Sequence, residues 1–176
     1  MTPLMLGARE GKLNIVSALT ARGADQFLRC HASSGDTNGF TALMFASQEG
    51  HEDVVEYLVD AFVEQFTKKA GPAHSKPRLL EETSIKGKTA LLLAAEKGHR
   101  RIARTLIHRG ASVNSIATDA LGLQTCPLFE VSRSENAVRY PNTVKRMHLM
   151  KYMIRKDTCL DKLNVANHYV HVFMIR

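Results

Sequence analysis

Histidine and cysteine are the residue types in this chain best suited to hold a metal or to act in nucleophilic catalysis. The chain has eight histidines and three cysteines. His168 and His171 lie three residues apart, but no Cys or Asp cluster joins them, and a structural zinc site takes about four protein ligands. Cys126 and Cys159 lie at no spacing that supports pairing with a histidine. We therefore expect no metal, no cofactor and no catalytic site.

Known catalytic motifs are also missing from the sequence. It contains no phosphate-binding loop, no zinc-protease motif, no nucleophile elbow and no kinase signature. Two further histidines, His51 and His99, each directly follow a glycine, at the same position of a repeated pattern. Repetition at one structural register favours turn capping, or hydrogen bonding between repeats, over metal ligation.

The repeated pattern organises most of the chain. Each of three segments has a threonine, a leucine two residues later and a glycine nine residues after the threonine. The threonines are Thr2, Thr41 and Thr89, and the glycines are Gly11, Gly50 and Gly98. Threonine caps a helix by accepting a hydrogen bond from a backbone N–H, and glycine supplies the left-handed backbone that ends it. Apolar residues at helical spacing follow each glycine, so each unit is predicted to be a helix, a tight turn, a second helix and a loop.

The segments GFTALMFASQEGH and GKTALLLAAEKGH, with GASVN closing the third unit, resemble the ankyrin repeat. This resemblance implies an all-α solenoid of stacked helix-turn-helix units joined by β-turn-like loops. Met5, Met44 and Leu92 occupy the position that is often histidine in the family. We therefore expect apolar packing there in place of a buried polar network.

The repeats occupy residues 1–114, as units 2–25, 36–69 and 86–114. Their threonines are 39 and 48 residues apart, against a family period of about 33. The excess is assigned to a second-unit helix that continues to about Lys69, followed by a loop insertion over about 70–85 that begins with helix-breaking Gly and Pro. Residues 115–176 are interpreted as a degenerate fourth, capping repeat and a tail. That tail is either a short strand, a packed terminus or the start of a longer sequence.

The charge differs between the two halves of the chain. Residues 1–96 carry 10 Lys or Arg against 12 Asp or Glu, whereas residues 97–176 carry 14 against 5. The basic half gives the alternative function, binding of nucleic acid or an acidic partner. Its candidate residues are Arg100, Arg101, Arg104, Arg109, Lys145 and Arg146.

No apolar run is long enough to span a membrane, no leader pattern is seen, and the three scattered cysteines suit a reducing compartment. We expect a cytoplasmic or nuclear protein.

The ankyrin resemblance also implies which residues contact a partner. In the family these lie at the β-turn tips and on the exposed face of the first helix of each unit. The matching positions are Arg9, Glu10, Thr37, Asn38, Phe40, Gln48, Glu49, Ile85, Lys86, Lys88, Glu96 and Lys97. Phe40 has two interpretations, an exposed aromatic anchor or a side chain packed against the neighbouring turn.

The expected function is that of a non-catalytic scaffold or adaptor, which binds another protein through the concave face and turn tips of the array. We expect a monomer, either as a whole protein or as one part of a larger multidomain protein. Because Thr2 directly follows Met1, the first unit lacks the turn that precedes the others. Its outer edge is therefore expected to be bare, through truncation or an atypical cap.

Overall fold

The computed structural model describes residues 1–31, 37–70, 78–113, 115, 117–118 and 124–125. Within these residues the regular secondary structure is almost entirely helical. The helices are α1 (Pro3–Arg9), α2 (Leu13–Ala21), α3 (Ala42–Glu49), α4 (Glu52–Ala70), α5 (Arg78–Glu81), α6 (Ala90–Lys97) and α7 (Arg100–His108).

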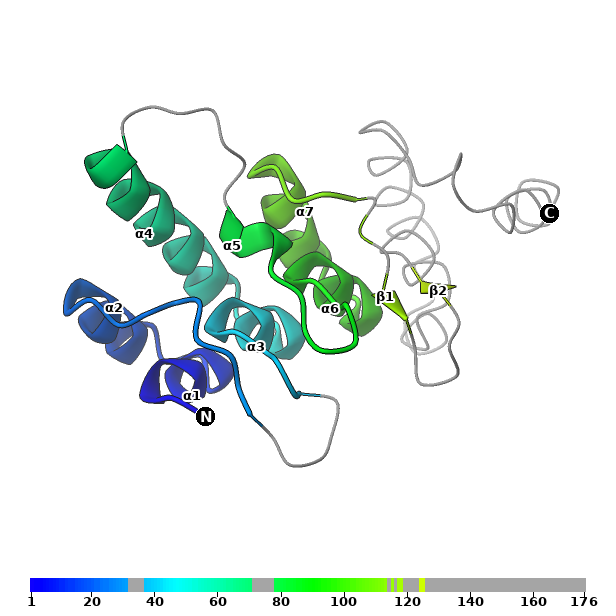
Figure 1. The fold of residues 1–176 in the computed structure, drawn as a ribbon, viewed down its shortest axis with the longest axis horizontal. Helices are drawn as coiled ribbons and strands as arrows, with labels where there is room; N and C mark the ends of the chain where they lie inside the picture. Colours follow the sequence, from blue (N-terminus) through cyan, green and yellow to red (C-terminus); the bar gives the residue numbers. More distant parts are fainter. Residues whose placement is uncertain (32–36, 71–77, 114, 116, 119–123, 126–176) are drawn as a thin grey trace, which may run out of the picture.

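The helices stack as pairs along one direction (Figure 1). Within the pairs α1 packs against α2, α3 against α4, and α6 against α7. Between pairs, α1, α3 and α6 form one row of packed helices, and α2, α4 and α7 form a second. Each unit therefore contacts its neighbours through both of its helices. This is the all-α solenoid that the repeated pattern predicts.

Threonine side chains begin all three first-row helices. The hydroxyl oxygens of Thr2, Thr41 and Thr89 accept hydrogen bonds from the backbone nitrogens three residues later, at 3.2, 3.4 and 3.3 Å. Each threonine has extended backbone angles, as expected of a residue that precedes the first helical turn. The caps fix where the helix starts and so set the register of each unit.

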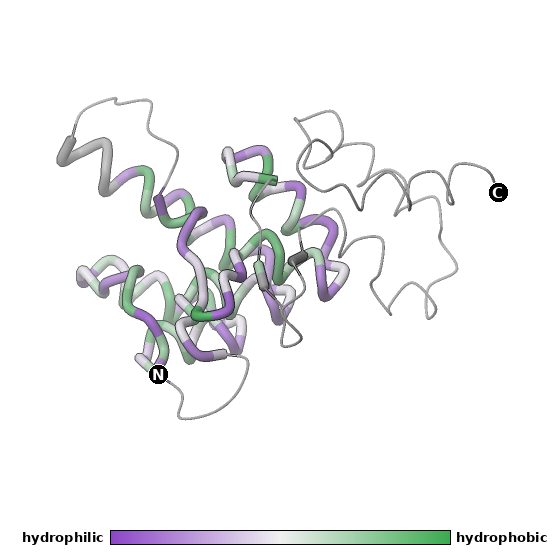
Figure 2. The backbone as a smooth tube through the Cα atoms, turned by 45° about the vertical axis from the view of Figure 1, so that its right-hand side comes forward, coloured by the Kyte–Doolittle hydropathy of each residue, from purple (hydrophilic) through white to green (hydrophobic). Residues whose placement is uncertain are grey.

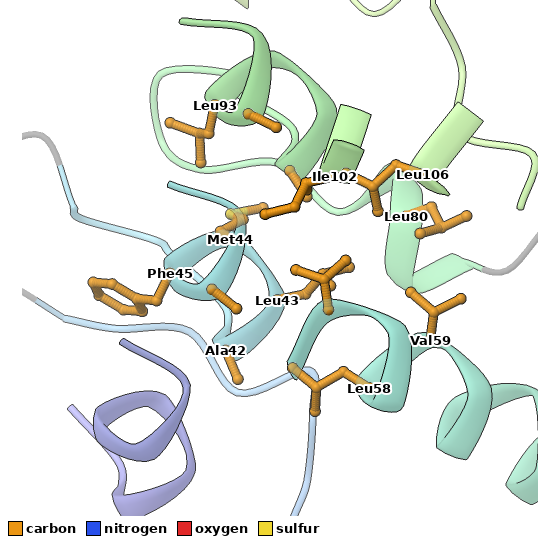
Figure 3. Close-up of a cluster of buried hydrophobic side chains, with 14 of the residues drawn as sticks. Ala42, Leu43, Met44, Phe45, Leu58, Val59, Leu80, Leu93, Ile102 and Leu106 are labelled. Carbon is orange, nitrogen blue, oxygen red and sulfur yellow. The ribbon is translucent and has the colours of Figure 1, made fainter. Parts of the chain in front are cut away.

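The core lies between the two rows. Figure 3 shows Leu43, Leu58, Val59, Leu80 and Ile102 converging from α3, α4, α5 and α7. Figure 2 shows hydrophobic and hydrophilic residues alternating along both helix rows, the pattern of helices that are buried on one side. The positions expected to replace the family histidine with apolar packing are indeed buried, namely Met5, Met44 and Leu92.

Histidines join neighbouring units. The His51 Nε2 lies 2.8 Å from the backbone carbonyl oxygen of Arg9, and the His99 Nε2 lies 2.9 Å from that of Gln48. A carbonyl oxygen only accepts, so each Nε2 is the donor. This confirms the hydrogen bonding between repeats that their shared position predicts.

The segment between the second and third units is only partly a loop. Helix α4 ends at Ala70, close to the end expected near Lys69. The insertion predicted over about 70–85 contains the short helix α5, whose Leu79 and Leu80 are buried against α4 and α6. The loop prediction is therefore wrong for Arg78–Glu81, where two apolar side chains close the core. Residues 71–77 lie outside the described residues.

Carboxylates at the end of α5 fasten it to two other loops. The Glu82 carboxylate lies 2.6 Å from an Arg29 guanidinium nitrogen, and a second nitrogen of that group donates to the Thr83 carbonyl at 2.7 Å. The Glu81 carboxylate accepts from the Ser112 backbone N–H at 2.8 Å. The insertion thus connects the loop after the first unit with the loop after the third.

Beyond the third unit, two short strands pair. Strands β1 (Ala117–Thr118) and β2 (Gln124–Thr125) are antiparallel, with Ala117 opposite Thr125. Ala111, Val113 and Ala117 are buried, so the chain packs against the third unit as it leaves α7. The predicted degenerate repeat and tail, residues 115–176, lie mostly outside the described residues.

Candidate protein-interaction surface

Two loops project beside the first-row helices, and we call residues 37–40 and 84–88 the finger loops. In the first, the Phe40 N–H donates to the Thr37 carbonyl at 3.1 Å, and the Gly39 N–H donates to the Cys30 carbonyl at 2.8 Å. In the second, the Ser84 N–H donates to the Lys88 carbonyl at 2.9 Å. Each finger is therefore a tight turn closed by backbone hydrogen bonds.

The two finger loops contact each other directly. The Ile85 N–H donates to the Asn38 carbonyl at 3.3 Å. Gly39 has a φ of 80°, and a Cβ atom placed on it would lie 2.8 Å from the Ile85 nitrogen. This close approach requires glycine, because any side chain at position 39 would separate the fingers. The fingers thus form one continuous surface, which holds Ile85 in a fixed position.

Phe40 is not an exposed binding anchor. Its side chain is 0% exposed, and its ring packs edge-on against Phe45 with the centroids 5.3 Å apart. The prediction that it contacts a partner is therefore wrong, and the alternative, packing within the fold, is correct. Ile85 is instead the exposed large apolar residue on the fingers, at 68% exposure.

The predicted charged positions lie at the ends of the first-row helices. Arg9 and Glu10 are exposed and pair with each other at 3.3 Å. Glu49 and Lys97 are also exposed. At the third unit, the Lys88 ammonium lies 2.7 Å from the Glu96 carboxylate, which joins the second finger to α6. This mostly buried pair holds the finger against the helix.

The remaining predicted positions are half-buried. Thr37, Asn38 and Lys86 lie on the fingers, and Gln48 lies near the end of α3. The Asn38 Oδ1 and Gln48 Oε1 are buried and find no hydrogen-bond partner among the described residues. Their backbone carbonyls accept from Ile85 and His99 respectively. Asn38 thus fixes the backbone beside Ile85, whereas Gln48 joins α3 to His99 of the third unit.

Two arginines of the basic half pair with acidic residues of α4. The Arg101 guanidinium lies 3.0 Å from the Glu52 carboxylate, and Arg109 pairs with Asp60 through two nitrogens. The hydrogen bond to Asp60 raises the pKa of Arg109, while its partial burial opposes the shift. Arg104 is exposed and Arg100 half-buried, whereas Lys145 and Arg146 lie outside the described residues. Two of the four described arginines therefore form ion pairs between the second and third units.

Histidines and cysteines are also present in the part of the chain that the structure describes. No group of three or more His, Cys, Asp or Glu side chains there is arranged to hold a metal ion. None of the described helices is both long and apolar enough to cross a membrane. Cys30 is a buried free thiol.

Sequence reasoning missed three contacts of this surface, all of which join separate elements. These are the Lys88–Glu96 ion pair, the hydrogen bond between the fingers, and the packing of α5 against the core. In the sequence of the second finger, Gly87 indicates a turn, and it has a φ of 73° in the structure. The bond between the fingers and the burial of α5 could not be inferred from residue spacing, because both depend on how the units stack.

Stacked helix pairs with capped first helices, glycine turns and projecting fingers define a repeat solenoid, an architecture whose extended surfaces commonly serve for binding. Residues 4–117 match the family profile described as ankyrin repeats in three copies. The chain belongs to the ankyrin-repeat family. Members of this family are generally non-catalytic modules for protein–protein interaction.

Two curated proteins similar to this chain come from an invertebrate and a mammal. One is an ankyrin repeat and KH domain-containing protein of Caenorhabditis briggsae, 31% identical over 114 residues, which is 65% of this chain. The other is ankyrin repeat and KH domain-containing protein 1 of Homo sapiens, 36% identical over 113 residues, or 64% of this chain. The matched segment spans only 4% of the length of each relative.

Proposed function

We propose that this protein binds another protein through the two finger loops and the adjoining ends of α1, α3 and α6. By the ankyrin resemblance, these elements correspond to the concave face and turn tips of the array. The single observation that carries the proposal is Ile85, which is 68% exposed on an otherwise polar finger. An exposed apolar side chain surrounded by polar groups is the arrangement of an anchor residue in an interface.

The backbone around Ile85 supports the proposal. The hydrogen bond to Asn38 and the close approach of Gly39 hold the tip in place. The Lys88–Glu96 pair fastens the same finger to α6. A surface that is ordered before binding loses less conformational entropy when a partner docks. The fingers therefore provide a preorganised apolar contact with charged groups at its rim.

A site-specific crosslinking experiment tests this proposal. A photoreactive amino acid is placed at Ile85, and for comparison at Val63, which is 38% exposed on the second-row helix α4. We expect a defined protein to crosslink to position 85 in cell extract and not to position 63. The variant Ile85→Asp should abolish capture by a probe at Glu49, whereas Val63→Asp should leave it intact. Equal capture from positions 85 and 63 would remove the proposal.

A salt titration separates this function from the alternative of nucleic-acid binding. Contacts to phosphates release counterions, so such binding weakens steeply as the salt concentration rises. We expect the full chain to show no such salt-dependent binding to duplex or single-stranded nucleic acid, because Arg101 and Arg109 are already paired. Tight binding that Arg100→Ala and Arg104→Ala weaken would favour the alternative instead.

We also propose a cytosolic or nuclear location. The scattered cysteines support it, because disulfides persist mainly in oxidising compartments, and Cys30 is a buried free thiol. Imaging of the tagged full chain tests the location, and a signal confined to the secretory pathway would contradict it.

A further inference from the structure

Arg29 lies in the loop between the first unit and the first finger, and its side chain contacts the residues that precede the second finger. One guanidinium nitrogen donates to the Thr83 carbonyl at 2.7 Å, and a second lies 2.6 Å from the Glu82 carboxylate. A guanidinium group presents its N–H donors in a rigid planar fork, so two contacts to successive residues define both its position and its orientation. Arg29 therefore holds the backbone that enters the second finger at Ser84.

The backbone beside Arg29 is in turn fastened to the first finger. The Cys30 N–H donates to the Phe40 carbonyl, and the Cys30 carbonyl accepts from the Gly39 N–H, both at 2.8 Å. These distances are typical of well-formed hydrogen bonds. A side chain that is anchored at the first finger thus binds the start of the second.

Together these contacts close a ring that contains both fingers. From Arg29 the ring passes through the hydrogen bond to Thr83 and along the chain to Ile85. The Ile85 N–H then donates to the Asn38 carbonyl, and the first finger leads back to Cys30 beside Arg29. The bond from Ile85 to Asn38 is long, at 3.3 Å, so a small displacement of either finger breaks it. The contacts of Arg29 hold the fingers at the separation that this bond requires.

Helix α5 gives the contacts of Arg29 a rigid base. Both leucines of α5 are buried in the core, where the helix packs against α4 and α6 (Figure 1). Glu82 directly follows α5, and its side chain is only 12% exposed, so little water competes with Arg29 for its carboxylate. On the other side, the Glu81 carboxylate accepts from the Ser112 N–H at 2.8 Å. The acceptors of Arg29 are therefore fixed in the fold.

The Lys88–Glu96 pair holds the second finger in a different way. It joins the far end of that finger to α6, which belongs to the same unit, at 2.7 Å. This pair fixes the finger within its own unit and does not determine its distance from the first finger. Arg29 comes from the loop that precedes the first finger, so it fixes one finger relative to the other.

We propose that Arg29 is a positioning residue for the binding surface. Through Thr83 it sets the place of Ile85 relative to the first finger, so that a partner meets a fixed apolar contact. A contact that is ordered before binding loses less conformational entropy on association, so Arg29 strengthens binding through Ile85. This inference rests on the proposed function of the fingers, to which it adds the residue that keeps their apolar contact in place.

NMR relaxation of the full chain tests the positioning without any partner. In the parent, the backbone order parameter of Ile85 should be about 0.85, the value of rigid backbone, and Arg29→Ala should lower it below about 0.6. Ala103, in α7, should keep a value of about 0.85 in both proteins. Order parameters describe motion in the folded state, so a change in overall stability alone does not move them.

Two further variants separate positioning from charge and from general stability. Arg78→Ala is the matched control, because Arg78 pairs with the same Glu82 at 3.6 Å and its side chain is 81% exposed. It should leave the Ile85 order parameter unchanged. Arg29→Lys keeps the charge but lacks the fork, so Ile85 should remain more mobile than in the parent. The Arg29 side chain is 42% exposed, so all three variants should retain the circular dichroism spectrum of the parent.

Capture of the partner tests the connection to binding. With the photoreactive probe at Glu49, Arg29→Ala should reduce capture at least about threefold, because ordering one side chain on association costs about that factor in affinity. Arg78→Ala should leave capture unchanged. An unchanged Ile85 order parameter, full recovery of that parameter by Arg29→Lys, or unchanged capture by Arg29→Ala would each overturn the inference. Absence of capture by the parent chain contradicts the proposed function itself, so the two failures are read from different proteins.

Discussion

The imidazole ring of His99 lies against Gly50 of the preceding unit, and its Nε2 donates to the Gln48 carbonyl at 2.9 Å. A Cβ atom placed on Gly50 would lie 2.6 Å from His99 Cε1, a distance that real atoms do not adopt. His51 has the same relationship to Gly11 and Arg9. The glycine therefore has two roles, since it ends the helix and leaves room for the ring of the next unit.

Replacing Gly50 with alanine should separate these two roles. The residue has a φ of 90°, so any side chain incurs the strain of left-handed backbone, about 1–2 kcal/mol. The clash with the His99 ring adds to this, so we expect a loss of about 2–4 kcal/mol in the free energy of unfolding. Urea denaturation measures the loss.

Gly23 provides the matched control for this variant. Its φ is 82°, but a Cβ placed on it meets no atom within 4 Å in the described structure. Gly23→Ala should therefore lose only the backbone strain, about 1 kcal/mol. Equal losses for Gly23→Ala and Gly50→Ala would show that the ring of His99 does not occupy this position.

Removal of the histidine itself tests the hydrogen bond between units. His99→Ala should lower the free energy of unfolding by about 1–2 kcal/mol, through a lost hydrogen bond and lost packing on Gly50. His99→Gln keeps an amide donor and should recover part of the loss. The exposed His108 of the neighbouring helix serves as the control, and its replacement by alanine should change stability by less than about 0.5 kcal/mol. A His99→Ala variant as stable as the His108 control would exclude a contribution from the hydrogen bond.

The features predicted well from the sequence are those determined within one repeat. Thr41 caps its helix, Gly50 ends it and His51 reaches the preceding unit because each position recurs at a fixed offset from the others. Such local signals need no knowledge of how distant segments meet. They establish the fold and the register of the units.

The features that sequence reasoning missed depend on how side chains pack in the folded chain. Phe40 follows a finger glycine and reads as an exposed tip, but its ring turns inward onto Phe45. Leu79 and Leu80 lie in a segment too short to show helical periodicity, and their burial depends on the packing of α5 against α4 and α6. Exposure therefore leaves Ile85 as a candidate contact residue and removes Phe40 from the candidate surface.

Phe40 and Ile85 should respond in opposite ways to truncation. Phe40→Ala leaves a cavity in the core and should lower the free energy of unfolding by about 3–5 kcal/mol. Ile85→Ala should change stability by less than about 0.5 kcal/mol, while it weakens binding to the crosslinked partner. Thermal unfolding and a binding assay on both variants make the comparison. A stable Phe40→Ala variant that had lost binding would restore Phe40 as the contact residue.

The short helix α5 gives the last prediction, which concerns the insertion. Leu80 is fully buried between α4, α6 and α7 (Figure 3), so Leu80→Ala should lower the free energy of unfolding by about 2–5 kcal/mol. Arg78 begins the same helix, but its side chain is 81% exposed and its pair with Glu82 is long, at 3.6 Å. Arg78→Ala should therefore cost less than about 0.5 kcal/mol. Urea denaturation of the two variants distinguishes an insertion that completes the core from a dispensable loop, because in a dispensable loop both changes would be equally small.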